Sequence, residues 1–501
     1  MQRSLFGILV LALLSVAGYS WTQNPSQAQH GTEETSYVDN IVENQHSVLV
    51  EGKTLRYLSR TGHLILRTEQ GQPRASIFFV AYSLDSADPS RRPLTFNFNG
   101  GPGSSSVWLH LGAFGPRKVL VDEQGLPTRP YRLVDNPYTL LDQTDLVFVD
   151  PVSTGYSRAV AGVDPQQFHG VSTDQEYLAE FIRLYLTRFQ RWDSPRFLSG
   201  ESYGATRAAY LSNYLQKKHG IYLNGIILIS AALNFQTIRF DPGNELPYSL
   251  FLPSYTATAW YHGKLKSQFN SLKDALQSAE RFATIDYHVA LMQGNQLPVR
   301  ERSRIAQQMA RLTGISEDFI QQSNLRLTNR RFIGQLLSDE GRIMGRLDSR
   351  FTGIDPDRIA EGYASDPSYS AIQGPFTETF NHYVRTELGF ETDLPYEVLT
   401  DRVYPWDYDT AENRYLNVAE DLREAVHQNP ALKVLVASGY YDLATPYYAT
   451  TYTFNHLGMP QDLSDSIMLR YYESGHMIYL HPASMRQLKT ELTSFYGSSG
   501  E

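Results

Sequence analysis

The sequence predicts an α/β fold, with a mostly parallel central sheet, helices on both of its faces and a helical cap insertion. Short apolar runs such as PLTFNFN (93–99) and NGIILIS (224–230) alternate with stretches whose apolar residues recur at helical spacing. Continuous apolar strands between helices are typical of a parallel sheet that is buried on both faces. The alternation stops near residue 234 and resumes near residue 396, which indicates an insertion.

These patterns divide the 501 residues into four predicted parts. They are a signal peptide (1–28), the first part of the α/β core (29–233), a mostly helical cap insertion (234–396) and the second part of the core (397–501). We expect the cap to pack over the C-terminal edge of the sheet. An independent helical domain with no part in the site is the alternative.

The first residues have the organisation of a signal peptide. Arg3 supplies a short positive region, and Leu5 to Ala17 form an apolar run. That run is shorter than the roughly 20 residues of a membrane-spanning helix. Cleavage is expected near 18–20 or at 26–28, and an uncleaved N-terminal anchor is the alternative.

The composition excludes several classes of protein and site. The formal net charge is -9 and there is no basic block, so nucleic acid and anionic membrane surfaces are not expected partners. The count of cysteine is 0, which excludes a cysteine nucleophile, thiolate metal sites and disulfides. There is also no usable N-x-S/T glycosylation acceptor, and together these absences favour an exported or periplasmic bacterial protein.

The elements of the core follow in chain order. Residues 46–85 predict β-hairpins. A helix over 173–189 is expected, with Thr173 and Glu176 as a capping box at its start. The further predicted elements are the strands TDLVFVD (144–150), RFLSG (196–200), LKVLVAS (432–438) and SIMLRYYES (466–474), and an amphipathic closing helix over 485–495.

The motif GESYG (200–204) lies between a predicted strand and a predicted helix that begins at Ala205. A serine at G-x-S-x-G in this context is typical of a nucleophile elbow, because small flanking residues let the strand and helix approach closely. We expect Ser202 to be the nucleophile. The backbone N–H of Tyr203, at the helix N-terminus, is a candidate oxyanion donor. An ordinary small-residue turn is the alternative.

A second glycine-rich turn, NGGPGS (99–104), follows the strand that ends near Phe98. The second oxyanion donor in α/β-hydrolases comes from such a loop, and Gly101 is the candidate. A phosphate-binding P-loop is excluded because no Lys-Ser/Thr follows. A passive Gly-Pro turn remains the alternative.

A carboxylate and a histidine follow two later strands in the order that α/β-hydrolases use, which is Ser, then Asp or Glu, then His. They are Asp442 and His476. We expect His476 to accept the proton of Ser202 and Asp442 to orient the imidazole. His476 and His481 are five residues apart with no third ligand, so no metal site is expected.

The motifs resemble those of a known family. FNFNGGPGSSS, DQTDLVFVDPVSTGYS, FLSGESYG, ASGYYDLATP and YYESGHM resemble the ordered blocks of the serine carboxypeptidases (peptidase family S10), in the spelling of its bacterial branch. The resemblance covers roughly residues 94–496. It implies an α/β-hydrolase fold with a helical insertion over the site, and an enzyme that removes C-terminal amino acids from peptides. It implies Ser202, Asp442 and His476 as the triad, with Gly101 and Tyr203 as the oxyanion donors.

The same resemblance implies that Asn99, the amide of Gly100 and Glu201 hold the terminal carboxylate of the substrate. An ionised Glu201 would repel that group, whereas a protonated Glu201 donates a hydrogen bond to it, and a like-charge neighbour raises the pKa of such a group. The alternative is that Glu201 pairs with a cation such as Arg207. The sequence departs from many members at Ser104, where they have a disulfide-bonded cysteine.

The expected function is an exported serine-type carboxypeptidase that hydrolyses the C-terminal peptide bond through a Ser-His-Asp triad and an acyl-enzyme. Its expected partners are peptides with a free C-terminus, with no cofactor and no stable membrane association after signal removal. An esterase or acyltransferase with the same triad is one alternative, because the fold by itself does not prove peptidase action. A catalytically silent binding protein with this fold is the other.

Overall fold

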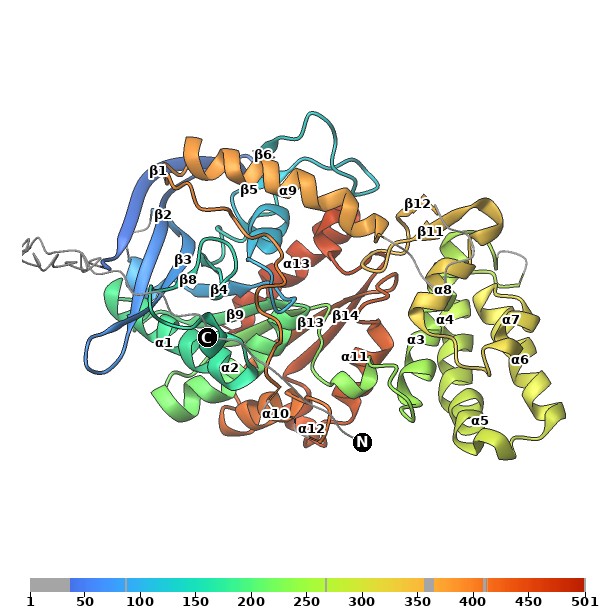
Figure 1. The fold of residues 1–501 in the computed structure, drawn as a ribbon. Coiled ribbons are helices and arrows are strands. Elements are labelled where there is room, and N and C mark those ends of the chain that lie inside the picture. Colours follow the sequence, from blue (N-terminus) through green and yellow to red (C-terminus); the bar gives the residue numbers. More distant parts are fainter. Residues whose placement is uncertain are drawn as a thin grey trace, which may run out of the picture. The chain divides into compact units, whose positions relative to one another are not determined.

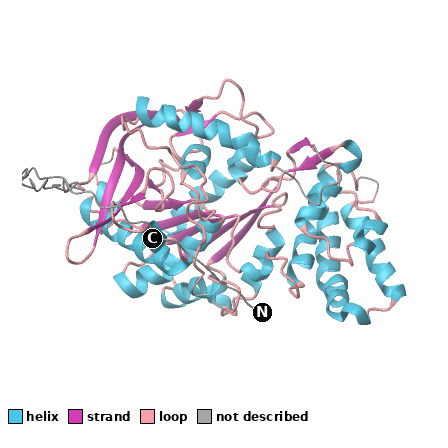
Figure 2. Ribbon diagram, in the orientation of Figure 1, coloured by secondary structure: helices cyan, strands magenta, loops and turns pink. Residues whose placement is uncertain are grey.

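The computed structural model describes residues 37–85, 88–265, 268–355, 365–408, 411 and 413–499. Residues Val38–Glu501 form one compact unit (Figures 1 and 2). The predicted signal peptide lies outside the described residues. Over the ranges just given, none of the helices is both long and apolar enough to cross a membrane.

A single large sheet organises the described chain. Its neighbouring strands run in the order β1-β2-β3-β7-β4-β9-β10-β13-β14, and β8 pairs with β3 off this path. Two small hairpins, β5–β6 and β11–β12, lie outside it. The strands of the large sheet are β1 (Asn40–Val50), β2 (Lys53–Arg67), β3 (Pro73–Leu84), β4 (Leu94–Phe98), β7 (Asp145–Val149), β8 (Arg158–Ala159), β9 (Arg196–Glu201), β10 (Gly225–Ile229), β13 (Lys433–Gly439) and β14 (Ile467–Tyr472). The small hairpins consist of β5 (Arg117–Val119), β6 (Leu133–Asp135), β11 (Arg342–Met344) and β12 (Thr352–Ile354).

The pairing confirms the predicted mostly parallel sheet. Strands β7, β4, β9, β10, β13 and β14 pair in parallel with their neighbours. The predicted N-terminal hairpins are β1, β2 and β3, which extend the sheet antiparallel from β7. Because parallel strands end at the same edge, the loops after β4, β9, β13 and β14 meet there.

Helices cover the sheet and build the insertion (Figure 1). The α-helices are α1 (Val171–Arg188), α2 (Tyr203–His219), α3 (Leu246–Tyr261), α4 (Leu272–Arg281), α5 (His288–Gln293), α6 (Val299–Thr313), α7 (Glu317–Gln322), α8 (Asn329–Gln335), α9 (Pro367–Thr386), α10 (Ala419–Gln428), α11 (Tyr447–Asn455), α12 (Gln461–Ser464) and α13 (Pro482–Ser499). Short 3-10 or π segments are η1 (Pro89–Arg91), η2 (Leu109–Phe114), η3 (Pro165–Phe168), η4 (Phe235–Thr237), η5 (Phe282–Tyr287), η6 (Gly294–Gln296), η7 (Ser338–Glu340) and η9 (Ile478–Leu480).

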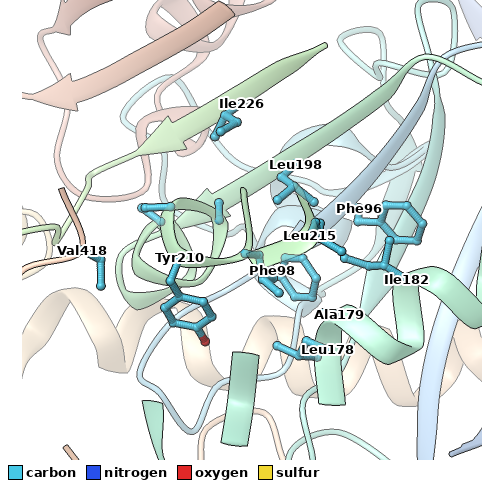
Figure 3. Packing of buried hydrophobic residues seen from close by; sticks show 14 of the residues in the cluster. Phe96, Phe98, Leu178, Ala179, Ile182, Leu198, Tyr210, Leu215, Ile226 and Val418 are labelled. Atoms are coloured by element: carbon cyan, nitrogen blue, oxygen red, sulfur yellow. The ribbon is translucent and has the colours of Figure 1, made fainter. Parts of the chain in front are cut away.

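Alternate residues of the parallel strands point to opposite faces, so each strand contributes to two cores. On one face, Leu198 of β9 and Ile226 of β10 pack with α1, α2 and α10 (Figure 3). On the other face, Phe197 and Ile227 pack with α9 and α13. The continuous apolar runs in the sequence are therefore a consequence of burial on both sides.

Helix α1 begins two residues before the predicted capping box, so that prediction was wrong. Gly170 is the N-cap, and Thr173 lies inside the first turn, where its hydroxyl donates to the carbonyl of Gly170 at 3.3 Å. The backbone N–H of Val171 donates to the carbonyl of Asp407 at 2.9 Å. A long-range backbone contact, rather than a local side-chain cap, determines where this helix starts.

The stretch predicted as a cap contains two groups of helices that pack differently. Helices α3 to α8 share one hydrophobic cluster with Met344 of β11. That cluster also buries Leu443, which follows the predicted catalytic Asp442. Helix α9 instead contributes Ile372, Phe376 and Phe380 to the core beneath the sheet.

Candidate active site

The loops that follow four parallel strands line one cleft with a volume of about 670 Å³. Asn99 and Gly101 come after β4, Ser202 after β9, and His476 after β14. Asp442, after β13, lies buried directly behind His476. The structure thus brings the predicted site residues to one edge of the sheet, where ligands bind in open parallel sheets.

Ser202 occupies a sharp turn between β9 and α2. Its backbone has φ 61° and ψ -123°, a conformation that is strained for a residue with a side chain. The flanking glycines are needed because a Cβ on Gly200 would lie 2.0 Å from the carbonyl oxygen of Gly204. A Cβ on Gly204 would lie 2.1 Å from the carbonyl oxygen of Phe98. The turn therefore has the geometry of a nucleophile elbow.

Asp442 and His476 form a buried hydrogen-bonded pair. Nδ1 of His476 lies 2.6 Å from Oδ2 of Asp442. A proton on Nδ1 leaves Nε2 as the acceptor, which is the tautomer a general base requires. Burial lowers the pKa of His476, but the charge of Asp442 and its hydrogen bond outweigh burial and raise the pKa above its ordinary value.

Neighbouring groups hold this pair in place. Asp442 accepts hydrogen bonds from the backbone of Ala444 at 2.7 Å and from the backbone and hydroxyl of Thr445 at 3.0 and 2.7 Å. The hydroxyl of Ser230 donates to the carbonyl of His476 at 2.7 Å. These supports were not found from the sequence, although Thr445 stands in the block ASGYYDLATP that carries the resemblance.

The glycine loop after β4 lies against the start of helix α2. A Cβ on Gly100 would lie 2.5 Å from the backbone nitrogen of Tyr203, so only glycine permits this approach. Gly101 has φ 106°, in the region that favours glycine. The N–H of Tyr203 is the first of helix α2 and has no acceptor within the helix. Gly100 is thus a neighbour of Tyr203, and Gly101, the next residue, lines the same cleft as Ser202 and Tyr203.

Arg207 of α2 joins this loop to the helices beneath it. Its side chain is fully buried and donates to the carbonyls of Asn99 and Pro102, each at 2.8 Å. Its Nε donates to Asp174 of α1 at 2.7 Å. The two hydrogen bonds from Arg207 hold both ends of the turn against helix α2. They therefore fix the loop relative to Ser202, which immediately precedes the same helix.

Asp174 is neutralised and fully hydrogen bonded. Besides Arg207, it accepts hydrogen bonds from the hydroxyl of Tyr177 at 2.7 Å and from the hydroxyl of Tyr210. Buried charges persist when they are paired and satisfied in this way. The alternative that Glu201 pairs with Arg207 is wrong, because Arg207 makes its ion pair with Asp174.

Glu201 and Asn99 each present a buried polar atom without a hydrogen-bond partner among the described residues. These atoms are Oε2 of Glu201 and Nδ2 of Asn99, and the hydroxyl of Tyr479, which also lacks a regular hydrogen bond, lies beside both residues. Oδ1 of Asn99 accepts from the backbone of Leu109 at 3.0 Å. Burial raises the pKa of Glu201 to about 7, against the lowering effects of His476 and the Tyr479 hydroxyl. Both residues line the same cleft as Ser202.

Hydrogen bonds hold the loop at Ser104, the position where many serine carboxypeptidases have a disulfide-bonded cysteine. The Ser104 hydroxyl accepts from the indole Nε1 of Trp108 at 2.9 Å and donates to the carbonyl of Ser105 at 3.0 Å. Its backbone N–H donates to the carbonyl of Gly100 at 3.0 Å. Ser104 also forms a β-bridge with Leu399, which ties the loop to the segment after α9.

Part of the insertion contacts the loops of the predicted triad directly. The backbone N–H of His476 donates to the carbonyl of Leu347 at 2.7 Å, and that of Leu443 donates to the carbonyl of Arg346 at 3.0 Å. The sequence predicted that the cap packs over this edge of the sheet, but not which of its residues make the contact. Across the part of the chain that the structure describes, no group of three or more His, Cys, Asp or Glu is arranged to hold a metal ion.

Comparisons with known proteins identify the family. The model of the serine carboxypeptidase family matches residues 52–477, so the chain belongs to this family. Serine carboxypeptidase-like 36 of Arabidopsis thaliana is 26% identical over 181 residues, which are 35% of this chain and 36% of that protein. A pheromone-processing carboxypeptidase of Yarrowia lipolytica is 26% identical over 199 residues, which are 39% of this chain and 29% of that protein.

These alignments span about a third of the length of each relative. Both relatives are eukaryotic, and membership of the bacterial branch stays a prediction. Among solved structures, a proline iminopeptidase of Mycobacterium smegmatis aligns over 88% of this chain and 98% of its own, with 14% identity and a TM-score of 0.35. That score is too low to add to the fold assignment, which rests on the strand order.

We predict that Arg207→Met lowers the free energy of unfolding by about 3–5 kcal/mol, because it leaves the buried Asp174 carboxylate without its cation. Activity should fall as well, since the Asn99 and Pro102 carbonyls lose their donor. Urea unfolding measures the first effect. Arg183→Met is the matched control, because Arg183 pairs with Glu180 at the surface and should cost no more than about 1 kcal/mol. Equal losses in the two variants would contradict the role of Arg207.

Proposed function

We propose that this protein is an exported serine carboxypeptidase that removes the C-terminal residue of peptides. The observation that carries the proposal is the pair of unpartnered buried atoms, Asn99 Nδ2 and Glu201 Oε2, in the cleft that also holds Ser202 and His476. Other buried side chains of the described residues also lack a partner, but these two atoms line the cleft beside Ser202, where a ligand would complete them.

The chemistry of these two atoms favours a carboxylate as that ligand. The amide of Asn99 donates hydrogen bonds, and a protonated Glu201 donates as well. The pKa of Glu201 is raised to about 7, so the carboxyl is largely protonated in mildly acidic solution. Two donors that converge beside a nucleophile suit the terminal carboxylate of a peptide, together with the backbone amide of Gly100.

The proposed reaction begins when Ser202 Oγ attacks the carbonyl carbon of the last peptide bond. His476 Nε2 accepts the hydroxyl proton, and Asp442 stabilises the resulting imidazolium. The N–H groups of Gly101 and Tyr203 donate to the oxyanion of the tetrahedral intermediate. When the intermediate collapses, the imidazolium protonates the leaving nitrogen, and the C-terminal amino acid departs.

The acyl group then remains on Ser202 as an ester. Water attacks that ester, with His476 as the base that accepts a proton from the water. The second tetrahedral intermediate uses the same two N–H donors. Its collapse returns the proton to Ser202 Oγ and releases the shortened peptide with a new terminal carboxylate.

Export is part of the proposal and is supported by the sequence of residues 1–28. Arg3 followed by the apolar run Leu5 to Ala17 has the organisation of a signal peptide. A chain without cysteine keeps its fold in an oxidising compartment without any disulfide to form. A bacterial periplasmic or extracellular location is the inferred destination.

Three matched substrates test the proposal: a blocked dipeptide with a free C-terminus, its C-terminal amide and a simple ester. The wild type should hydrolyse the free acid with a kcat/KM at least about a hundredfold above that of the amide. The reason is that only the acid supplies a carboxylate to accept hydrogen bonds from Asn99 and Glu201. Ser202→Ala should reduce turnover of every substrate by at least about 10³-fold. Release of the amino acid and of the ester's acid product, separated by chromatography, gives both measurements.

Each remaining result points elsewhere. Turnover of the ester alone would replace the proposal with an esterase or acyltransferase. A wild type that turns over none of the three would indicate a silent binding protein. Turnover that persists in Ser202→Ala would contradict the nucleophile, and thermal unfolding of the variant shows whether it is folded.

We predict that KM for free-acid peptides rises as pH increases through about 7, because ionised Glu201 repels the substrate carboxylate. Above that pH, KM should increase by up to about tenfold per unit, since only the protonated fraction binds. In Glu201→Gln the amide donates at every pH, so this dependence should disappear. Steady-state kinetics from pH 5 to 9 measure it.

The matched control is an ester substrate without a carboxylate, whose KM should show no such rise in the wild type. Ionisation of His476 affects kcat, and its pKa should be lower in Glu201→Gln because the charge of Glu201 helps to raise it, so the comparison uses KM. If the Glu201→Gln variant keeps the wild-type rise in KM, Glu201 takes no part in carboxylate recognition.

A further inference from the structure

We propose that Arg346 makes the enzyme prefer peptides whose C-terminal residue has an acidic side chain. This inference rests on the proposed carboxypeptidase function and adds a substrate class to it. Arg346 lies in the loop between β11 and β12, on the insertion, and lines the cleft that contains Ser202 and His476.

The backbone of the Arg346 loop is bonded to both strand-end loops of the triad. The carbonyl of Arg346 accepts from the N–H of Leu443, and the carbonyl of Leu347 accepts from the N–H of His476. The N–H of Arg346 donates to Oδ1 of Asp366 at 3.1 Å. The Cα of Arg346 is therefore held at a fixed position relative to His476, as a specificity residue must be.

The guanidinium of Arg346 is exposed to the cleft and makes no ion pair with any carboxylate of the described residues. Arg350, four residues later in the same loop, behaves differently: it is tied to Asp348 at 2.6 Å. Asp366 also lines the cleft, but its Oδ1 accepts from the backbone and hydroxyl of Ser368 at the start of α9. Arg346 is thus a cation that the described fold leaves available for a ligand.

The position of Arg346 identifies the part of the substrate that it meets. His476 protonates the nitrogen of the leaving residue, so groups beside His476 face that residue. Arg346 and His476 line the same cleft, and Leu347, the residue after Arg346, accepts a hydrogen bond from the backbone of His476 at 2.7 Å. Because Asn99 and Glu201 take the terminal carboxylate in the proposed function, Arg346 meets the side chain of the same residue.

The chemistry of arginine makes an acidic side chain the fitting ligand. A guanidinium binds a carboxylate through two parallel hydrogen bonds, in a planar geometry that lysine does not offer. In a partly enclosed cleft such a pair is stronger than on an open surface. A C-terminal aspartate or glutamate would form this ion pair with Arg346. Asparagine and glutamine have nearly the same shape but would supply no negative charge.

Arg239 supplies a matched control in the same cleft. It is also an exposed arginine that lines the cleft, but it follows η4, and its guanidinium lies over the ring of Phe235 at 5.7 Å from the ring centre. Removal of either arginine changes the charge of the cleft by one unit. Only Arg346 is bonded through its backbone to the loop of Asp442 and, through Leu347, to that of His476.

The test uses blocked dipeptides that end in Glu, Gln or Lys, and compares kcat/KM ratios within each enzyme. The wild type should cleave the Glu peptide about tenfold better than the Gln peptide. Arg346→Gln should reduce that ratio to about twofold or less, and Arg239→Gln should leave it unchanged. Arg346→Glu should instead favour the Lys peptide. A ratio within one enzyme cancels any change in the pKa of His476.

A second measurement needs no variant. Free glutamate, as a product, should inhibit the wild type about tenfold more strongly than free glutamine, at equal ionic strength. Near-UV circular dichroism checks that each variant is folded before its ratio is used.

The outcomes separate this inference from the proposed function. If no peptide with a free C-terminus is cleaved, the proposed function fails and the inference fails with it. If the Gln peptide is cleaved but Glu gives no advantage, only the role of Arg346 is overturned. An equal loss of preference in Arg239→Gln and Arg346→Gln would show that the overall positive charge of the cleft, and not Arg346 itself, causes the preference.

Discussion

The buried ion pair between Arg207 and Asp174 is the interaction on which the rest of the site depends. Through it, helix α2 is joined to α1 and to both ends of the glycine loop after β4. Helix α2 begins immediately after Ser202, so the same helix positions the proposed nucleophile and the loop that supplies Gly101. Strands β4 and β9 already lie side by side in the sheet, and the pair adds a side-chain link between the loop of Gly101 and the helix that begins at Tyr203, the two predicted oxyanion donors.

A buried ion pair of this kind is expensive to desolvate, and it persists because every partner is satisfied. The hydroxyls of Tyr177 and Tyr210 share the charge of Asp174, and the ring of Tyr203 lies 5.1 Å from the Arg207 guanidinium. Glu201, one residue before Ser202, forms no ion pair with an arginine or lysine among the residues that the structure describes. Its raised pKa follows from burial without an ion pair, and that difference makes it suited to meet a carboxylate.

The insertion contributes to the site as well as to the surface. Leu443, next to Asp442, is buried in the hydrophobic cluster of α3 to α8, and the β11–β12 loop is bonded to the backbones of Leu443 and His476. A change in that cluster would therefore reach Asp442 through one peptide unit. In this family member, the loops of the predicted acid and base are therefore in contact with the segment that follows β10.

Local patterns in the sequence predicted the parts of the molecule that are determined locally. The strands of the parallel sheet and the glycine requirement at 200 and 204 follow from apolar runs and from one short motif, and the structure has both. The start of α1 was predicted wrongly because a backbone bond to Asp407, more than two hundred residues away in sequence, determines it. For the same reason the partner of Arg207 and the position of Arg346 did not follow from the sequence: each contact joins distant segments, and no local spacing records it.

The proposed function requires Ser202 to be a nucleophile in a cleft that recognises a free carboxylate. Covalent labelling with a fluorophosphonate, followed by mass spectrometry of the digested protein, tests both halves at once. We expect a single adduct on Ser202, formed more slowly when a blocked dipeptide with a free C-terminus is present but not when its amide is present. An adduct on another residue, no adduct at all, or equal protection by acid and amide would contradict it.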